Sequence, residues 1–565
     1  MKQINEKLKI NSESVEGVST KGHQQTAQDS VLLKMAFFMI GALFLIFPLS
    51  SQAVEIHVAE GGTGDGSATN PFGSIQEGID SAQPGDVVYI QSGTYEESIQ
   101  STRNGTSSQP IVIQGDDSNG PVVLTWPGRV LRVQNSFITI QNVTIDGQYG
   151  DADAVSIRDE SDGLVLRNLE ISRSGRDCVD MASHSNILIE GCLIHHCLDS
   201  TDGRKDAHGV TGGSVSGLVI RDTEIHTFSG DGIQFDPGRT LPGWSDILLE
   251  RCHIWLEPLK EEANGFSVGV VPGENAVDTK AKGENPRSSM IIRDSVFHGF
   301  RDGLIANMAA LNIKENVDVL IERVTLYNNE IALRLRGPTP SHPSGAWVSV
   351  HNTVIYDADT AVRYENDIQN LEIWNTTLGT EIDRPFVEAE ADNSVLDIRN
   401  FLIASDSLPT EAQGAYNIAV PHTSFVAPDE GDFRLSAGSP AIDTGETLQE
   451  IIVDRDGIQR PQGEAFDIGA YEWCEGDCEI HDPPDGGMDG GSSHDGSTIN
   501  DGGVHYQDGD TSENGTDSNG CSCRSVLNHH KPSRFPLVLL VCFMALIGLI
   551  MSHRRKSFTR AGSTE

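Results

Sequence analysis

An eight-residue pattern of apolar positions recurs ten times between Ile138 and Ile403 and constrains the fold more than any other feature of this sequence. Written as apolar-x-apolar-x-x-apolar-x-apolar, its first copy is Ile138, Ile140, Val143 and Ile145. The other nine copies begin at Leu164, Ile187, Leu218, Ile247, Met290, Val319, Val348, Leu371 and Leu396. Alternation of apolar and polar residues at both ends of the pattern indicates β-strand and not helix. Copies that start 23 to 43 residues apart indicate one structural unit per copy, stacked on its neighbours.

Two short strands, joined by a bend and followed by a coil of variable length, describe one rung of a right-handed parallel β-helix. We therefore predict an all-β chain, a single-stranded β-helix of about ten or more rungs with a cap at each end. Equivalent residues of neighbouring rungs would then stack at about 4.8 Å. The alternative is a β-propeller, whose blades have periods of about 40–45 residues and Trp-Asp or kelch signatures. The sequence shows no such signature.

The octets define the central part of the predicted domain organisation. Residues 101–405 form the β-helix, and residues 54–100 form an N-terminal cap with a short amphipathic helix that places Ile75, Ile79 and Ala82 on one face. Residues 406–473 lose the octet and are interpreted as the C-terminal cap. An open β-helix end would template aggregation, so a cover at each end is expected.

The two ends of the chain predict export and anchoring. Residues 1–53 end in an apolar run followed by small residues and are interpreted as a signal peptide with a long leader; an uncleaved anchor is the alternative. Residues 474–534 are an acidic linker rich in Gly, Asp and Ser. Residues 535–551 are long enough to cross a bilayer, and the basic tail 552–565 then lies in the cytoplasm before any processing. We therefore expect a protein of the cell envelope or cell surface.

Charge and cysteines narrow the expected partners. Lys and Arg total 40 against 82 Asp and Glu, a formal charge of −42, which argues against nucleic acid as a ligand.

Cys192 and Cys252 occupy core positions of the octet, whereas Cys474 and Cys478 flank a short loop and could form a disulfide after export. We expect a monomer.

A second short strand follows most octets, and its outward positions carry the candidate site. We align five segments on an inward apolar residue: 176–182, 207–213, 230–236, 274–280 and 301–307. The residue that follows the inward position is Asp180, Thr211, Gln234 or Asp278 in four of these segments. A second column, two residues further along the chain, contains Asp236, Lys280 and Asn307. By strand alternation both columns face the same side. A turn column of Asp177, His208, Asp231 and Asp302 is interpreted as mainly structural.

The octets, the opening cap and the closing segment FDIGAYEW resemble secreted bacterial β-helix proteins of the pectate-lyase-like kind. The ending, with Gly520-Cys521-Ser522-Cys523-Arg524 before the apolar span and basic cluster, resembles a myxobacterial C-terminal sorting signal. ENAVDTK at 274–280, followed by Arg301, resembles the chondroitinase B and alginate lyase family, although Arg301 precedes Asp-Gly here and His-Gly in that family. Family nine pectate lyases are an equally loose match.

The resemblance implies a polysaccharide lyase that cleaves a polyuronate by calcium-assisted β-elimination. Lys280 would be the catalytic base and Arg301 its helper. Asp236, Glu274 and Asp278 would hold Ca²⁺, and four further residues would contact substrate: Asp180, His208, Gln234 and Asn307. Two alternatives stay open. A non-catalytic surface protein that binds glycans fits the stalk and anchor, and a polygalacturonase-like hydrolase would pair Asp180 with Asp236.

Overall fold

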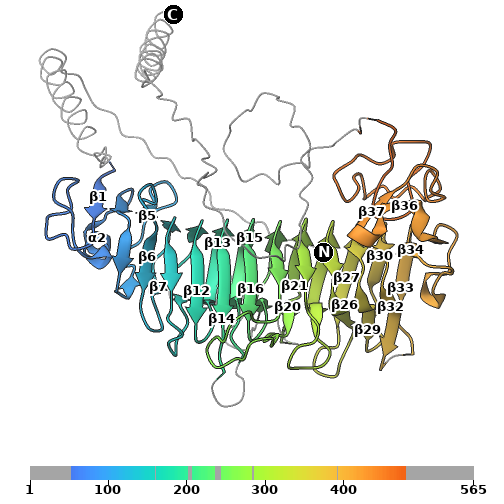
Figure 1. The fold of residues 1–565 in the computed structure, drawn as a ribbon, viewed down its shortest axis with the longest axis horizontal. Helices are drawn as coiled ribbons and strands as arrows, with labels where there is room; N and C mark the ends of the chain where they lie inside the picture. Colours follow the sequence, from blue (N-terminus) through green and yellow to red (C-terminus); the bar gives the residue numbers. More distant parts are fainter. Residues whose placement is uncertain are drawn as a thin grey trace, which may run out of the picture. The chain divides into compact units, whose positions relative to one another are not determined.

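In the computed structural model the chain forms a right-handed parallel β-helix (Figure 1). The structure describes residues 53–158, 161–200, 206–235, 243–282, 286–390, 392–476 and 478. Its parallel strands form a 22-stranded and a 13-stranded sheet. The larger sheet consists of two stacks that share the long strands β13 (Val179–Glu190) and β15 (Val210–Arg221), so each rung has three faces.

The first stack contains the first half of each octet. Besides β13 and β15 it consists of β1 (Glu55–Val58), β2 (Val87–Ile90), β5 (Ile111–Gly115), β8 (Ile138–Gln141), β11 (Val165–Arg167), β18 (Ile247–Glu250), β21 (Ser288–Arg293), β24 (Val317–Glu322), β27 (Ala346–His351), β30 (Leu371–Trp374) and β33 (Leu396–Arg399). Ile140 pairs with Leu166, which pairs with Ile189, so the octets align rung upon rung as predicted. The first strands, β1 and β2, come from the segment assigned to the N-terminal cap.

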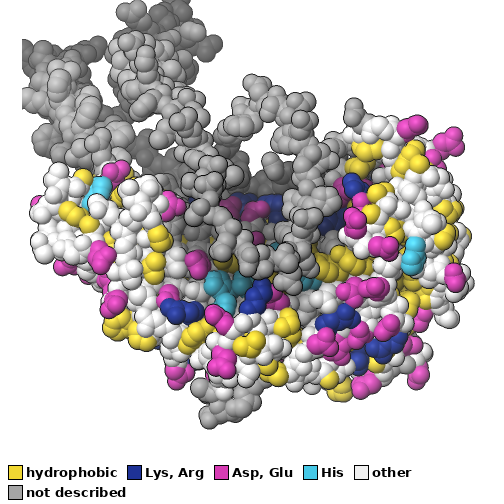
Figure 2. Space-filling view, in the orientation of Figure 1, with side chains coloured by type: hydrophobic (Ala, Val, Ile, Leu, Met, Phe, Trp, Pro, Cys, Tyr) yellow, Lys and Arg dark blue, Asp and Glu magenta, His cyan; other side chains and the backbone are white. Residues whose placement is uncertain are grey.

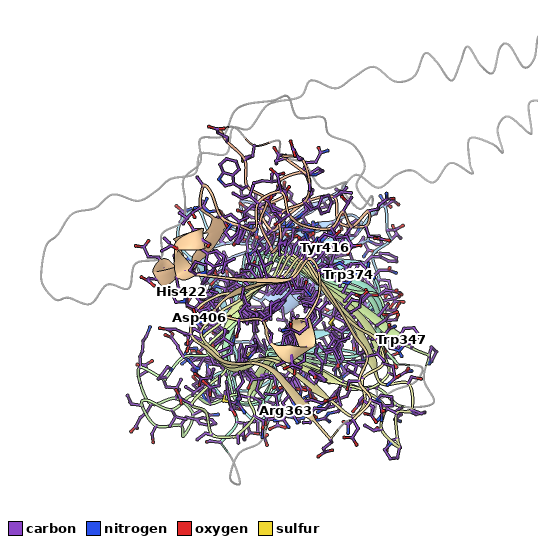
Figure 3. All side chains as sticks on the ribbon, turned by 90° about the vertical axis from the view of Figure 1, so that its right-hand side faces the viewer. Trp347, Arg363, Trp374, Asp406, Tyr416 and His422 are labelled. Carbon is purple, nitrogen blue, oxygen red and sulfur yellow. A yellow bond between two sulfur atoms is a disulfide. The ribbon has the colours of Figure 1, made fainter. Side chains whose placement is uncertain are left out.

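The second stack holds the strands that follow the octets and carries the candidate site. It consists of β4 (Ile99–Gln100), β7 (Leu131–Val133), β10 (Val155–Ile157), β13, β15, β17 (Ile233–Phe235), β20 (Asn275–Thr279), β23 (Ala309–Ile313), β26 (Asn329–Arg336), β29 (Ala358–Glu365) and β32 (Ile382–Ala389). Figure 3 looks along the β-helix from its C-terminal end, and Trp347 of the first stack and Arg363 of the second lie outside the packed interior.

The third stack contains the second half of each octet. It consists of β3 (Gly93–Tyr95), β6 (Val122–Thr125), β9 (Thr144–Asp146), β12 (Glu170–Ser174), β14 (Leu193–Cys197), β16 (Glu224–Phe228), β19 (His253–Trp255), β22 (Val296–His298), β25 (Thr325–Tyr327), β28 (Val354–Ile355), β31 (Thr377–Leu378), β34 (Leu402–Ala404) and β35 (Ile418–Val420).

One left-handed residue in each octet makes the bend between the first and third stacks. Asn142 has φ +58°, Asn168 +50° and Asp222 +52°, and the same octet position is Asn or Asp in most other copies. Asn and Asp tolerate this conformation better than other side chains, so the bend costs little. The octet therefore encodes two inward strands and the corner that joins them.

Both ends of the β-helix carry additional structure. Helix α2 (Ile75–Ser81) buries Ile75 and Ile79, as predicted, and Glu97 accepts the Ile75 backbone N–H at 2.7 Å. The C-terminal segment contains an antiparallel pair, β36 (Phe425–Ala427) with β37 (Asp432–Leu435), and three single turns, η1 (Thr410–Ala412), η2 (His422–Ser424) and η3 (Pro428–Glu430). It packs against the flank of the third stack, where Tyr356 contacts Phe433.

Two disulfides lie in the described part of the chain. Cys474 pairs with Cys478, as the spacing allowed, and Cys178 pairs with Cys197 at an Sγ–Sγ distance of 2.10 Å. Cys192 and Cys252 are buried thiols. Among the described residues no helix is long and apolar enough to span a membrane. The predicted signal peptide falls almost entirely outside these residues, and so do the linker beyond Cys478, the membrane span and the basic tail.

Candidate functional site

The second stack brings together four of the five aligned segments in the predicted register. Val179 pairs with Val210, Val210 with Ile233, and Ile233 with Val277, and all four side chains are fully buried. The outward column is therefore Asp180, Thr211, Gln234 and Asp278, on successive rungs. Asp236 lies outside the described residues, so its predicted place in this site is not described.

The fifth segment, 301–307, does not occupy the predicted strand. Leu304, the expected inward residue, is 52% exposed, and the next strand of the stack is β23, in which Leu311 pairs with Val277. Asn312 consequently lies beside Asp278, in the place that the sequence alignment gave to the residue after Leu304. The chain makes several extra bends before it re-enters the stack, and the apolar pattern alone cannot distinguish Leu304 from Leu311.

This shift removes two predicted residues from the site. The Asn307 backbone N–H donates to Glu330 at 2.9 Å, and the Asn307 side-chain oxygen accepts from Arg363. Arg301 donates to Asp357 and Asp359 at 2.8 and 2.6 Å. Among the described contacts none joins Arg301 to Lys280. The structure therefore gives no geometric support for Arg301 as the helper of Lys280.

Lys314 takes the position next to Lys280 that the sequence alignment had assigned to Asn307. The Lys314 amine lies 2.8 Å from Asp278 Oδ1 and the Lys280 amine lies 3.6 Å from Asp278 Oδ2. The Lys280 side chain is 37% exposed and that of Lys314 is 14% exposed. Burial, followed by the nearby Asp231 charge, raises the pKa of Asp278 to about 6, and the two lysines oppose this shift.

A buried histidine lies between two carboxylates that belong to the rungs on either side of its own. His208 Nδ1 donates to Asp177 at 2.8 Å, and His208 Nε2 lies 3.6 Å from Asp231. Burial lowers the pKa of His208, but the hydrogen bonds to the two acids outweigh it and raise the pKa to about 10. The His208 side chain is 7% exposed. The prediction that His208 contacts substrate therefore gains no support, whereas the structural interpretation of the turn column does.

Asp231 is held by amides as well as by the histidine. Gln234 donates to it at 2.5 Å and Asn275 at 2.7 Å. Burial would raise the pKa of Asp231, but the hydrogen bonds from His208, Asn275 and Gln234 lower it. The predicted substrate contact Gln234 thus uses its amide group within the protein.

Three acids meet at the N-terminal side of the site. Arg158 forms an ion pair with Asp180 and lies 3.5 Å from Asp153, and Arg176 approaches Asp153 Oδ1 at 3.7 Å. Burial and the charges of Asp180 and Asp177 raise the pKa of Asp153 to about 6. Asp153 and Arg158 were not singled out in the sequence, because they precede the aligned segments by one rung.

We call the whole network the polar ladder. Its members are Asp153, Arg158, Arg176, Asp177, Asp180, His208, Asp231, Gln234, Asn275, Asp278, Lys280, Asn312 and Lys314. It runs along the outer side of the second stack, and ionic or hydrogen-bond contacts link its members across successive rungs.

The described residues do not fit the predicted calcium ion at Asp278. Calcium takes six to eight oxygen ligands at about 2.3–2.6 Å. Both Asp278 oxygens face lysine ammonium groups, and Glu274 is placed by a backbone hydrogen bond to Gly230. No group of three or more His, Cys, Asp or Glu in the described part of the chain is arranged to hold a metal. Calcium binding remains an untested prediction.

A second outward column, on the third stack, was not anticipated. It consists of the residues that follow six consecutive octets, and their rings stack in the order His195, His226, Trp255, His298, Tyr327 and Tyr356. Figure 2 shows histidines gathered near the middle of the face that it presents. We call this the aromatic ladder. Reading the position after each octet in the sequence would have found it.

Comparisons with known proteins agree with the fold. The family described as "Pel9A-like, right handed beta helix region" matches residues 56–331. A pectate lyase of Emericella nidulans, PEL9, is 33% identical over 82 residues, which are 14% of this chain and only a fifth of that protein's length.

Several solved structures of low sequence identity are similar to this chain. The pectate lyase Pel9A is 14% identical with a TM-score of 0.45, covering 75% of this chain and 97% of its own. A rhamnogalacturonan lyase is 14% identical with a TM-score of 0.40, covering 70% and 97%. A polygalacturonase from Erwinia carotovora ssp. carotovora is 10% identical with a TM-score of 0.36, covering 61% and 97%. These likenesses concern the fold.

Proposed function

We propose that this chain is an exported, surface-anchored β-helix protein that binds an acidic polysaccharide at the polar ladder and cleaves it by β-elimination. The observation that carries the proposal is the convergence of Lys280 and Lys314 on the single carboxylate of Asp278. With both amines protonated, these three groups carry a net positive charge on the surface of a chain whose formal charge is −42. Such a site favours an anionic ligand, such as a uronate carboxylate.

The geometry supports different catalytic roles for the two lysines. Lys314 is the more enclosed and would neutralise the substrate carboxylate, which acidifies the proton on the adjacent carbon. Lys280 is the more exposed and, as the free amine, would remove that proton. The electron pair of the broken C–H bond forms the carbon–carbon double bond, and the glycosidic oxygen leaves with its bonding pair and is then protonated.

The backbone of Lys280 is fixed on both sides, as a catalytic base requires. Its N–H donates to the Phe235 carbonyl at 3.1 Å, and the buried indole of Trp244 donates to the Lys280 carbonyl at 2.8 Å. The side chain can therefore move while its origin stays in place. We include no calcium ion in this proposal, because the described residues around Asp278 do not fit one.

A non-catalytic glycan-binding protein is the second candidate. It is favoured by the many ladder groups that bond to each other, since Asp231 alone is held by His208, Gln234 and Asn275. A network of this kind gives a rigid binding surface without any chemistry. This alternative predicts affinity for acidic glycans and no product.

Absorbance of newly formed unsaturated uronates distinguishes the candidates, because β-elimination makes that conjugated product and hydrolysis does not. A panel of polyuronates should be incubated with wild type, Lys280→Ala and Lys260→Ala. Lys260, the matched control, is 81% exposed and pairs only with Glu257 among the described residues. We expect Lys280→Ala to lose at least about a hundredfold in turnover, and Lys260→Ala to behave as wild type. Lyase activity that survives Lys280→Ala undiminished would remove Lys280 as the base.

A further inference from the structure

Every carboxylate of the polar ladder has a cationic side chain within 4.0 Å. Asp153 and Asp180 share Arg158, and Arg176 lies on the other side of Asp153. The described ladder contains five acids, Asp153, Asp177, Asp180, Asp231 and Asp278. It also contains five cations, Arg158, Arg176, His208, Lys280 and Lys314. With every group ionised, its formal charge is therefore zero.

The cations occupy the positions between rungs where an ion would bridge carboxylates. Arg158 lies between Asp153 and Asp180, which β10 and β13 place on neighbouring rungs. His208 belongs to the rung between those of Asp177 and Asp231, so these two acids lie two rungs apart with the imidazole between them. A protonated imidazole or a guanidinium cannot ligate a metal while it donates these hydrogen bonds.

One carboxylate oxygen of the polar ladder has fewer polar contacts than the others. Asp153 Oδ1 accepts no hydrogen bond from the described residues and faces Arg176 Nε at 3.7 Å. Arg176 is about half exposed, so it can move away from this oxygen. If a divalent cation entered the ladder, Asp153 with Asp177 and Asp180 would be its place, and Arg158 would have to leave first.

We infer that the polar ladder carries its own cations in place of a divalent metal, so that an acidic glycan binds there without calcium. This deepens the proposed function and rests on it for the identity of the ligand. The guanidinium of Arg158 and the imidazolium of His208 each lie between two acids, and Arg176 faces Asp153 as well. The lysine pair supplies the surplus positive charge for the glycan. A metal added to a neutralised site must displace a bonded cation, which makes its binding unfavourable.

The test is calcium titration of the exported portion of the wild-type protein, by calorimetry and by melting temperature with and without a chelator. We expect no heat of specific binding, and the same melting temperature in EDTA and in 5 mM Ca²⁺, which is about five-thousandfold above the Kd of a site of roughly micromolar affinity. Arg158→Ala should behave differently, because it removes the cation that lies between Asp153 and Asp180. Its melting temperature should rise by several degrees when Ca²⁺ is added.

Arg251→Ala is the matched control. Arg251 also bridges two acids, Asp222 and Glu250, but it lies at the octet bend, Asp222 is well exposed, and Glu250 keeps Arg293 as a second cation, so we expect no calcium dependence. Stabilisation of wild type by Ca²⁺ would overturn the inference, as would an Arg158→Ala protein that Ca²⁺ leaves unchanged. If Arg158→Ala does not fold, Arg158→Gln replaces it, and the wild-type titration is decisive by itself.

Glycan binding is measured separately, with polygalacturonate and alginate in EDTA. Affinity in EDTA equal to that in Ca²⁺ supports the inference, and affinity that appears only with Ca²⁺ contradicts it. If neither glycan binds in any condition, the proposed function fails, while the calcium titration still decides whether the ladder carries its own cations. The two failures are therefore distinguishable.

Discussion

The polar ladder and the aromatic ladder are two outward columns of the same β-helix with opposite electrostatics. In the polar ladder, acids and cations alternate between rungs, and the partners hold His208 in its charged form, with a pKa near 10. In the aromatic ladder, imidazoles lie against other rings, and burial lowers the pKa of His226 and His298 to about 3. Stacking at the spacing of one strand therefore favours either opposite charges or no charge.

The first prediction breaks the charge pairing of the polar ladder and has the largest expected effect on stability. Asp231→Ala leaves the buried amides of Gln234 and Asn275 without this acceptor and removes one of the two acids that flank His208, and we expect a loss of roughly 3–5 kcal/mol in unfolding free energy. Urea unfolding measures it. Asp222→Ala, which removes an exposed partner of Arg251, should cost at most about 1 kcal/mol. Equal losses in the two variants would contradict the assigned difference in burial.

The second prediction concerns the covalent link between the two faces. Cys178 precedes β13 in the second stack and Cys197 ends β14 in the third, so their disulfide ties both ladders within one rung. Replacing both cysteines by Ala should lower the unfolding free energy by about 3 kcal/mol, because a loop of 19 residues is no longer closed in the unfolded chain. Thermal unfolding of the oxidised wild type and the double variant provides the measurement, and an unchanged midpoint would show that the bond is not formed.

The third prediction uses the pH dependence of stability to distinguish the two ladders, and it has the smallest expected change in unfolding free energy per residue. His226 and His298 of the aromatic ladder have folded pKa values near 3, and His253, which stacks on Trp255 of that ladder, has one near 4. These values lie below the ordinary 6.5, so the unfolded chain binds more protons in acid. Stability should fall as the pH drops from about 6.5 towards 4, and His253→Gln should reduce this fall by roughly 1 kcal/mol.

His208 should show the opposite dependence on pH. Its folded pKa lies above that of the unfolded chain, so its contribution is complete below about pH 6.5 and is lost as the pH rises through 10. The difference in unfolding free energy between wild type and His208→Asn should therefore shrink between pH 8 and 10.5. A difference that stays constant over this range would show that His208 is not held as a cation.

The sequence was sufficient for the fold because inward apolar positions recur with little variation. Ile140, Leu166 and Ile189 occupy one column, and a left-handed residue at the octet bend, usually Asn or Asp, marks each corner. Outward positions follow no comparable rule. Asp180, Gln234 and Asp278 could be aligned because their segments keep a constant register, whereas Arg301 and Asn307 could not, because extra bends displace the next strand to β23.

The ion pairs of the site were beyond sequence reasoning for a physical reason. Lys314 meets Asp278, and Arg158 meets Asp180, across 36 and 22 residues respectively, so both contacts depend on the lengths of intervening coils. No local sequence pattern indicates these two ion pairs. The aromatic ladder, by contrast, has a periodic position after each octet, so its sequence signal was present.

The most direct test of the account is formation of unsaturated uronate product from polyuronates by the wild-type exported portion in the presence of EDTA. The account predicts that absorbance from the conjugated product rises with wild type, to the same extent with or without chelator, and stays at the background with Lys280→Ala. A folded wild-type protein that forms no such product from any polyuronate of the panel would contradict β-elimination at the polar ladder.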